Sequence, residues 1–311
     1  MLSLSDGTKK GLILGSTAVL PRNLRVKSRV SLLASLEVGI ATRSDLLIIA
    51  HPKSGNTWLK AMLSRLYQVR FGFPEQLLNK SDEYARLNPA VPRLAATNGY
   101  YSYEGAVGEE LKRPNSALRD KAIVFLPRHP LDIAVSWFFQ FTKRQSAHKQ
   151  ELINAFIEHP VDKYTVSMWE FVRNSDLGVE FLIDYLNGWR VALAGLERAI
   201  TVRYEDLRTH TELQLARINT LLGEDFSAQE IAEAVAWGSV DNLRKMESEG
   251  KFRQGGMTLR NPDDPNSFKV RRAKIGGYRD YFNRDELEEL DALVQARLDP
   301  ALGYTTDHAG H

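Results

Sequence analysis

Short, continuously apolar runs recur along this chain, and each is followed by a turn and then by a helical pattern of apolar residues. The runs cover residues 46–50, 122–126 and 199–202. Unbroken apolar runs of this length are typical of strands buried on both faces of a parallel sheet. After the first run, apolar side chains recur at the spacing of one helix face, at Leu59, Met62, Leu63 and Leu66. This repeated order predicts an α/β fold with a mainly parallel central sheet flanked by helices.

Helical patterns also fill most of the remaining chain. A helix is expected after Pro130 and another through residues 213–222, and residues 151–197 are mostly helical by pattern. Residues 283–286, Asn-Arg-Asp-Glu, have the form of a capping box and predict the start of a last helix. Residues 250–278 have little periodicity and many glycine, proline and asparagine residues, which predicts a long loop. Loops of that length in a compact domain are usually functional or disordered.

The pattern divides the chain into an N-terminal extension of residues 1–43, one domain of residues 44–300 and a C-terminal tail of residues 301–311. The extension mixes basic and apolar residues at loosely helical spacing. We interpret it as a surface helix packed on the body of the protein. The alternative is a basic amphipathic segment over residues 11–42 that touches a membrane or an acidic partner.

Membrane-spanning and leader segments are not expected. No apolar run reaches the ~20 residues needed to cross a bilayer. Lys9 and Lys10 precede a short apolar stretch that has a faint likeness to a signal peptide. Because Pro21 and Arg22 follow it in place of a small-residue cleavage site, we interpret the segment as part of the mature chain.

Composition narrows the classes further. The chain has 311 residues, of which 43% are apolar and 26% charged, and these proportions exclude collagen-like, coiled-coil and disordered chains. The 41 basic and 39 acidic residues leave a net charge of +2, which argues against a nucleic-acid-coating surface but allows a local basic pocket. The absence of cysteine excludes disulfide scaffolds, thiolate zinc sites and cysteine nucleophiles.

The strongest local signal is the segment of residues 51–58, His-Pro-Lys-Ser-Gly-Asn-Thr-Trp. It lies between a predicted buried strand and an amphipathic helix, so the first N–H groups of that helix face the loop without helical partners. The positive end of the helix dipole and the charge of Lys53 add to these donors. Together they predict a P-loop-like site for a phosphate or sulfate group.

This loop does not match the nucleotide-hydrolase pattern, which requires Gly-Lys-Ser/Thr with the hydroxyl on Mg²⁺. Here Lys53 precedes Ser54 and Gly55, and no glycine lies four residues before Gly55. Arg128 stands where an acidic residue would close the second strand. A metal-dependent nucleotide hydrolase or kinase is therefore disfavoured.

Two further basic elements accompany the loop. Arg128 is placed at the carboxyl end of the second strand, where ligands bind in open α/β sheets, and Ser136 follows by roughly two helical turns. The alternative for this element is an ion pair between Arg128 and Asp132 and a serine that faces solvent. Residues 268–279 are dense in positive charge with interleaved glycine and aromatic residues, which favours an anion clamp over a merely solvated loop.

In this order and spacing the three elements resemble the cytosolic-type sulfotransferase family over residues 44–300. Members of that family transfer a sulfuryl group from 3'-phosphoadenosine 5'-phosphosulfate (PAPS) to a hydroxyl or an amine. The family's loop Tyr-Pro-Lys-Ser-Gly-Thr-Thr-Trp is matched by residues 51–58, and its arginine and serine eight residues apart by Arg128 and Ser136. The late family loop Arg-Lys-Gly-x-x-Gly-x-Trp-Lys is matched by residues 271–279.

The resemblance implies a role for each matched residue. The residues that would hold the 5'-phosphosulfate are Lys53, Ser54, Gly55, Asn56 and Thr57. The aromatic residues that would flank the adenine are Trp58 and Tyr204. The residues that would bind around the 3'-phosphate are Arg128, Ser136, Ser239, Arg271, Arg272 and Ala273. Alanine replaces a family glycine at position 273, where it could restrict a backbone amide.

The implied reaction is an in-line displacement in which charge builds on the bridging oxygen of the donor, where Lys53 stabilises it. PAPS is the implied co-substrate, and no metal is implied. We further expect a bacterial member of the family, a cytoplasmic location and a small-molecule, lipid or glycan acceptor. A homodimer and peripheral membrane contact through residues 11–42 remain open.

The chain departs from the family at the expected catalytic base. The family carries Lys-Thr-His after Pro-Arg-Leu, whereas here Pro-Arg-Leu at 92–94 is followed by Ala-Ala-Thr-Asn. Asn98 stands at the histidine position, and an amide takes up no proton at neutral pH, so base catalysis worth ~10²–10⁴-fold is in question. Either Asn98 is an engineered replacement, or the acceptor is acidic enough to need little help, or another group is the base, with the candidates His51, His148 and Glu104.

Two points stay open at the level of sequence. Because of Asn98, a non-catalytic adenosine bisphosphate-binding protein is the alternative to an active sulfotransferase. The acceptor is not encoded in any motif. Aromatic residues could line an apolar acceptor pocket, although core packing explains them equally well: Tyr100, Tyr101, Trp137, Phe138 and Phe139.

Overall fold

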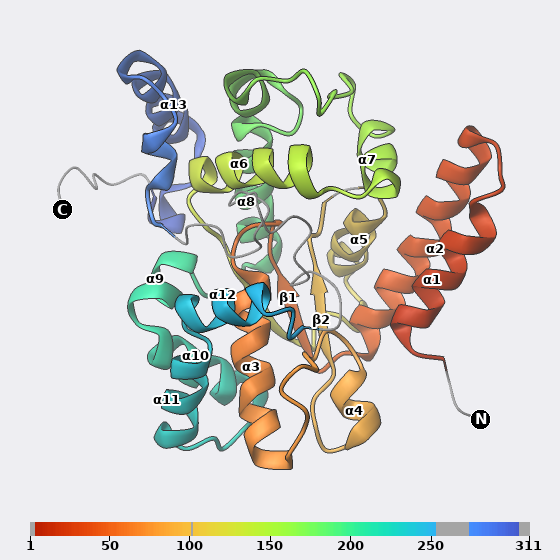
Figure 1. Cartoon of the computed structure of the whole chain (residues 1–311), viewed down its shortest axis with the longest axis vertical. Coiled ribbons are helices and arrows are strands. Elements are labelled where there is room, and N and C mark those ends of the chain that lie inside the picture. The colour runs from red at the N-terminus through yellow and green to blue at the C-terminus, as the bar shows by residue number, and fades with distance from the viewer. Residues whose placement is uncertain (1–3, 101, 253–273, 305–311) are drawn as a thin grey trace.

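A computed structural model describes residues 4–100, 102–252 and 274–304 of the chain. Within these residues, parallel strands form one sheet in the order β2-β1-β3-β4, and helices cover both of its faces (Figure 1). The strands are β1 (Leu46–Ile49), β2 (Leu94–Thr97), β3 (Ala122–Phe125) and β4 (Ala199–Thr201). The predicted α/β fold with a mainly parallel sheet is confirmed.

Helices connect and surround the strands. The α-helices of the described residues are α1 (Asp6–Thr17), α2 (Arg22–Arg43), α3 (Asn56–Phe71), α4 (Glu83–Leu87), α5 (Ala106–Lys112), α6 (Pro130–Phe139), α7 (Ala147–Asn154), α8 (Val179–Leu193), α9 (Tyr204–Thr209), α10 (Thr211–Leu222), α11 (Ala228–Trp237), α12 (Val240–Ser248) and α13 (Arg284–Arg297). The short 3-10 helices are η1 (Ser102–Gly105), η6 (Gly277–Asp280) and η7 (Pro300–Leu302), and the π-helical turns are η2 (Gln140–Arg144) and η3 (Glu170–Asn174). The predicted capping box at the start of the last helix is present, with Asn283 and Glu286 as its partners.

The central strands are buried on both faces, which explains their unbroken apolar sequence. Successive strand side chains point to opposite faces of a sheet. In β1, Leu46 and Ile48 pack with α3, α10 and α11, whereas Leu47 and Ile49 pack with α6 and α8. All four side chains have no exposed surface. The sheet is therefore a layer between two hydrophobic cores.

Strand β2 was not predicted from the sequence. It contains two alanines and a single β-branched residue, so neither length nor composition distinguishes it from a loop. It exists because it pairs with β1 in parallel register, with Leu46 opposite Leu94 and Ile49 opposite Thr97. This edge strand delivers Asn98 to the carboxyl end of the sheet.

The strand order creates a crevice beside β1. From β1 the chain crosses to β2 on one side, and β3 then pairs with β1 on the other side. The helix after β1, α3, packs on one face of the sheet, and the helix after β3, α6, packs on the opposite face. The loops that follow β1 and β3 therefore diverge, which is where open α/β sheets bind ligands.

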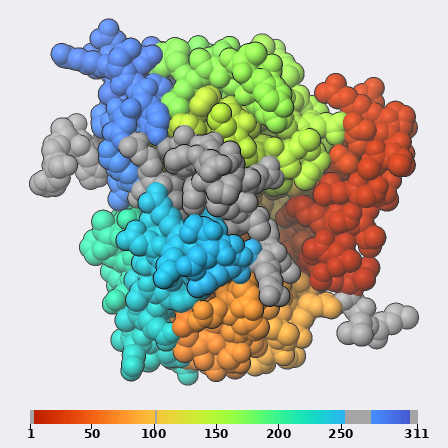
Figure 2. Space-filling model, viewed as in Figure 1, coloured from red at the N-terminus to blue at the C-terminus, as the bar shows by residue number. Residues whose placement is uncertain are grey.

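The N-terminal residues form a pair of helices beside the main body (Figures 1 and 2). Helix α2 contacts α5 and η1, and α1 packs along α2. Buried Leu33 of α2 contributes to a cluster with Tyr103 and Leu152, so the surface-helix interpretation agrees with the structure. Among the described residues, no helix is both long and apolar enough to cross a membrane.

Candidate functional site

The loop after β1 has a backbone shape that turns amide donors outward. Lys53 and Gly55 both have positive φ angles, 81° and 98°. The left-handed region costs a non-glycine residue such as Lys53 roughly 1–3 kcal/mol. Helix α3 begins directly after Gly55 with no side-chain cap, so its first N–H groups remain available to a ligand. A Cβ at Gly55 would lie 2.7 Å from Cδ2 of Tyr204, so glycine is required for this close approach.

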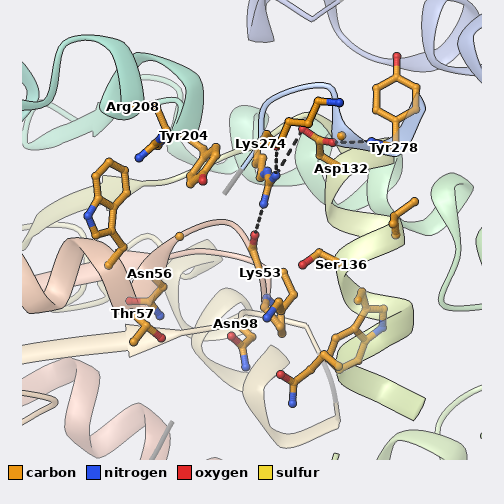
Figure 3. Close-up of a pocket in the computed structure, with 18 of the residues that line it drawn as sticks. Lys53, Asn56, Thr57, Asn98, Asp132, Ser136, Tyr204, Arg208, Lys274 and Tyr278 are labelled. Atoms are coloured by element: carbon orange, nitrogen blue, oxygen red, sulfur yellow. Dashed lines mark hydrogen bonds and ion pairs between the residues drawn. The ribbon is translucent and has the colours of Figure 1, made fainter. Parts of the chain in front are cut away.

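A pocket of about 250 Å³ lies where the loops after β1 and β3 diverge (Figure 3). Residues from distant parts of the chain form its wall, and nine of the predicted site residues are among them: Lys53, Gly55, Asn56, Thr57, Trp58, Asn98, Arg128, Ser136 and Tyr204. Among the described residues, basic side chains dominate the charged part of the lining, which contains Lys53, Arg128, Lys149, Arg208 and Lys274 against one carboxylate, Asp132. The pocket therefore suits a polyanionic ligand.

Arg128 joins three segments of the site. Its Nη1 donates to the carbonyl of Lys53 at 3.1 Å, and its Nη2 donates to the carbonyl of Lys274 at 3.0 Å. Nη2 also lies 3.4 Å from a carboxylate oxygen of Asp132, and the guanidinium covers the ring of Tyr204. An anion site and an Arg128–Asp132 ion pair were the two alternatives for this element, and the structure contains both the pair and a pocket-lining arginine.

Asp132, in the first turn of α6, anchors the segment that leads into η6. One carboxylate oxygen accepts the N–H of Gly276 at 2.9 Å, and the other accepts the N–H of Tyr278 at 3.1 Å. The Tyr278 ring stacks on His129 with a centroid distance of 5.1 Å. Burial lowers the pKa of His129 to about 4, so this stack contains a neutral imidazole at neutral pH. Gly276 and Tyr278 are thus held beside the pocket by the Asp132 carboxylate.

Trp58 and Tyr204 supply the aromatic part of the lining. The Trp58 ring nitrogen donates to the carbonyl of Gly238 at 2.7 Å, which fixes the indole plane. The two rings lie 6.1 Å apart, and the guanidinium of Arg208 lies 5.4 Å from the Trp58 ring centre. Burial raises the pKa of Tyr204, which keeps its hydroxyl neutral. A planar ligand between apolar faces fits this end of the pocket.

Asn98 lies on the pocket wall beside Lys53 (Figure 3). Its side-chain amide donates to a carboxylate oxygen of Glu104 at 2.9 Å. Glu104 is buried, is only 6% exposed, and stands behind the lining rather than in it.

The other predicted bases are less well placed. His51 is fully buried among aromatic rings, does not line the pocket, and has a pKa lowered by burial to about 3. His148 does not line the pocket, although its neighbour Lys149 does.

Two predicted site residues of the described part of the chain, Ser54 and Ser239, are not on the pocket wall. Ser54 is buried, and its hydroxyl has no hydrogen-bond partner among the described residues. Ser239 caps α12 by accepting the N–H of Asn242 at 3.4 Å, and its neighbour Val240 lines the pocket instead. Arg271, Arg272 and Ala273 lie outside the described residues. Their roles, and those of the two serines, stay predictions.

The sequence analysis missed other pocket residues. Arg208 follows Tyr204 by four residues on α9, so the one-turn spacing was a usable signal. Lys149 lies on α7, and Gln145 directly follows η2. Both line the pocket, and nothing local in the sequence marked them. Of the aromatic residues considered for an acceptor pocket, Trp137 lines it, Tyr100, Phe138 and Phe139 pack against the core, and Tyr101 lies outside the described residues.

Comparison with known proteins gives a family. A family model described as "Sulfotransferase domain" matches residues 43–301. The chain is 25% identical over 284 residues to cytosolic sulfotransferase 12 of Arabidopsis thaliana, which covers 83% of this chain and 78% of that protein. It is 21% identical over 269 residues to 3-alpha-hydroxysteroid sulfotransferase of Cavia porcellus, covering 82% of this chain and 83% of that protein.

Solved structures share the fold. Mouse sulfotransferase SULT7A1 complexed with PAP superposes with a TM-score of 0.56 at 18% identity, covering 85% of this chain and 89% of that chain. Retinol dehydratase in complex with androsterone and inactive cofactor PAP superposes with a TM-score of 0.53 at 16% identity, covering 83% of this chain and 80% of that chain. The architecture of β1 to α13 is therefore that of these enzymes.

Proposed function

The chain belongs to the sulfotransferase family, and on that premise we propose that it transfers a sulfuryl group from PAPS to a hydroxyl group of a small-molecule acceptor. The observation that carries the proposal is the cationic pocket beside β1, where Lys53, Arg128 and the start of α3 meet. The PAP complexes of two proteins with the same fold support this choice of donor.

The 5'-phosphosulfate is assigned to the loop after β1. Lys53 brings a full positive charge, and the uncapped N–H groups of α3 bring donors and the positive end of the helix dipole. Gly55 allows the backbone to approach Tyr204 closely, which leaves the amides uncovered by a side chain. These features together fit an anionic group at this end of the pocket.

The adenine and the 3'-phosphate are assigned to the remaining part of the pocket. Trp58 and Tyr204 present ring surfaces, and Arg208 adds a cation beside Trp58. Arg128 and Ser136 line the pocket at the start of α6 and two turns along it, and Lys274 adds a charge from the late loop. The guanidinium of Arg128 lines the pocket, although its Nε is buried and has no hydrogen-bond partner among the described residues.

In the proposed reaction, the acceptor oxygen forms a bond to sulfur while the bond from sulfur to the bridging phosphate oxygen breaks. The bridging oxygen leaves with the electron pair of that bond, and the acceptor hydroxyl releases its proton to water. Lys53 offsets the negative charge that grows on the leaving oxygen. Within the described residues, no cluster of His, Asp or Glu forms a metal site, and the proposal assigns the phosphates to basic side chains.

Calorimetry with PAP tests the proposal directly. Wild-type protein is expected to bind PAP, and Lys53→Ala is expected to weaken binding roughly 10- to 150-fold, because a hydrogen bond to a charged group contributes about 1.5–3 kcal/mol. Arg128→Ala is expected to weaken it at least as much, since it also frees the Lys53 carbonyl. Lys112→Ala is the control, because Lys112 is exposed on α5 and absent from the pocket wall. Wild-type protein that fails to bind PAP contradicts the proposal.

A non-catalytic adenosine bisphosphate-binding protein is the second candidate, and Asn98 on the pocket wall favours it. The two candidates differ in turnover. Sulfate transfer to 2-naphthol by the wild type, or a gain of transfer on Asn98→His, supports the enzyme. PAP binding without transfer by either form, across phenols, alcohols and amines, supports the binding protein.

We also propose domain boundaries and a cellular location for the protein. We assign the sulfotransferase domain to residues 44–300, with residues 1–43 as an N-terminal extension and 301–311 as a tail, and the family match over 43–301 supports this division. A cytoplasmic location is supported by relatives named cytosolic sulfotransferases. Bacterial origin, a homodimer and peripheral membrane contact through residues 11–42 stay predictions.

A further inference from the structure

A buried carboxylate stands directly behind the pocket wall. Glu104 belongs to η1, and both of its oxygens face side chains that line the pocket. One oxygen accepts the side-chain amide N–H of Asn98 at 2.9 Å, and the other lies 3.9 Å from Nζ of Lys149. Glu104 therefore contacts both side chains without being exposed in the pocket itself.

This contact decides which way the Asn98 amide faces. A carboxylate oxygen accepts hydrogen bonds and donates none, so only the NH₂ group of Asn98 can face it. The amide oxygen is attached to the same carbon and points away from Glu104. In Figure 3 this oxygen lies on the side of Asn98 that faces Thr57, in the first turn of α3. Asn98 thus presents a hydrogen-bond acceptor to the region where we place the sulfuryl group.

We propose that Glu104 is a positioning residue for sulfuryl transfer: it locks the Asn98 amide so that the amide oxygen accepts the hydrogen of the acceptor hydroxyl. The inference rests on the proposed function. Asn98 orients the hydroxyl oxygen toward sulfur and takes no proton. The proton passes to water as the new S–O bond forms and the bond to the bridging oxygen breaks.

The N-terminal helices help to hold Glu104 in place. Helix α2 packs on η1, and Lys10 of α1 donates to Glu37 of α2 at 3.3 Å and to the hydroxyl of neighbouring Tyr103 at 3.5 Å. Glu37 and Lys10 lie before residue 43, where the family match begins. The extension therefore supports η1, although none of its described residues lines the pocket.

A substitution of Glu104 changes the electrostatic environment of the charged and titratable groups around it. They come from several elements and comprise Lys149 of α7, Glu37 of α2, Tyr103 of η1 and Tyr185 of α8. Glu104→Gln keeps the side-chain shape and removes the charge. Because glutamine offers both NH₂ and C=O, it permits either orientation of the Asn98 amide.

Kinetics test the inference, with PAPS as donor and 2-naphthol as the acceptor probe. Glu104→Gln is expected to raise KM for 2-naphthol and lower kcat/KM roughly tenfold, while the Kd for PAP stays unchanged. Glu109→Gln is the matched control, because Glu109 is exposed on α5 and does not line the pocket. Unchanged kcat/KM in Glu104→Gln with PAP binding intact overturns this inference and leaves the proposed function standing.

A second pair of variants tests the inference through the pH–rate profile, which would not change if Glu104 only stabilised the fold. In Asn98→His, Glu104 becomes the partner of an imidazole N–H, which raises the imidazole pKa and yields a base worth ~10²–10⁴-fold in rate. Adding Glu104→Gln is expected to shift the acid limb of the pH–rate profile to lower pH. An identical profile in both backgrounds overturns the inference.

Selective ¹⁵N labelling of asparagine provides a test that needs no acceptor. The Asn98 side-chain NH₂ resonance, identified by its loss in Asn98→Asp, is expected to shift in Glu104→Gln while the other asparagine signals stay in place. An Asn98 resonance that does not respond contradicts the orientation argument. Failure of wild-type protein to bind PAP contradicts the proposed function instead, so the two failures are distinguishable.

Discussion

At the scale of single residues, His51 is a buried side chain that packs beneath the loop after β1. It directly precedes the loop that holds Lys53, has no exposed surface, and lies against the rings of Trp137 and Tyr185 at 5.7 and 5.4 Å. Its Nδ1 lies 2.8 Å from the carbonyl of Pro52, so the neutral ring carries its proton on Nδ1. Burial lowers the pKa of His51 to about 3. The ring is therefore a packing element rather than the base considered from the sequence.

This burial predicts an acid-sensitive fold. The unfolded chain protonates His51 near pH 6.5, whereas the folded protein resists protonation until about pH 3, so stability is full above pH 6.5 and falls as pH drops between these values. His129 adds a second contribution of the same sign, with a pKa of about 4. Each contributes about 1.4 kcal/mol per pH unit at most.

Urea unfolding at pH 7 and pH 5 measures the effect. His51→Asn is expected to lose less stability between the two pH values than the wild type, by about 2 kcal/mol, because one of the two buried imidazoles is gone. His210→Asn serves as the control, since His210 is exposed. A pH dependence in His51→Asn equal to that of the wild type contradicts the argument.

At the scale of elements, the site depends on contacts between helix ends and loops. Helix α6 begins with a proline and no side-chain cap, and the acidic residue of its first turn, Asp132, accepts two backbone N–H groups from the segment before and within η6. The same carboxylate pairs with Arg128. Asp132 therefore couples α6 to the segment around η6 directly, and to the loop after β1 through Arg128.

Asp132→Asn is expected to break this coupling. Asparagine has a single acceptor oxygen, so one of the two N–H groups would face an NH₂ group and lose its partner, at a cost of about 1–3 kcal/mol in unfolding free energy. Weaker PAP binding is expected as well, because Arg128 loses its ion pair. Urea unfolding and calorimetry measure the two effects. Asp285→Asn, exposed in the first turn of α13, is the control, and an Asp132 variant with wild-type stability would refute the coupling.

At the scale of the whole molecule, the pocket lies between structures on opposite faces of the sheet. Lys53, Trp58 and Tyr204 belong to the side of α3 and α9, whereas Arg128, Ser136 and Lys149 belong to the side of α6 and α7. Figure 1 shows these helix groups on either side of the strands. A ligand that bridges both walls ties the two hydrophobic cores together.

Bound PAP is therefore expected to stabilise the entire fold. At one hundred times its Kd, PAP adds about 2.7 kcal/mol, which corresponds to a rise in Tm of about 4 °C for a chain of this length. The shift is expected to persist in EDTA, because we assign the phosphate charges to Lys53 and Arg128. Thermal unfolding with and without PAP and EDTA measures it. A shift that EDTA abolishes contradicts this assignment of the charges.

Some strands of the sheet could be predicted from the sequence and one could not. β1 and β3 were predicted because burial on both faces requires unbroken apolar runs. β4 was predicted from a run of the same kind, although it lies at the sheet edge and is only partly buried. β2 was missed because small residues at a sheet edge carry no such signature, and its pairing with β1 is a long-range contact.

In the pocket, too, some features follow from the sequence and others only from the tertiary structure. The sequence alone determined that Lys53 lies in the turn between β1 and α3 and that Arg128 follows β3, because both positions depend on which residues come directly after a buried strand. Only the tertiary structure brought Lys149, Arg208 and Lys274 to one pocket and set Glu104 behind Asn98. No local pattern specified the contacts of Lys149 and Glu104, whereas the one-turn spacing between Tyr204 and Arg208 was a usable signal for Arg208.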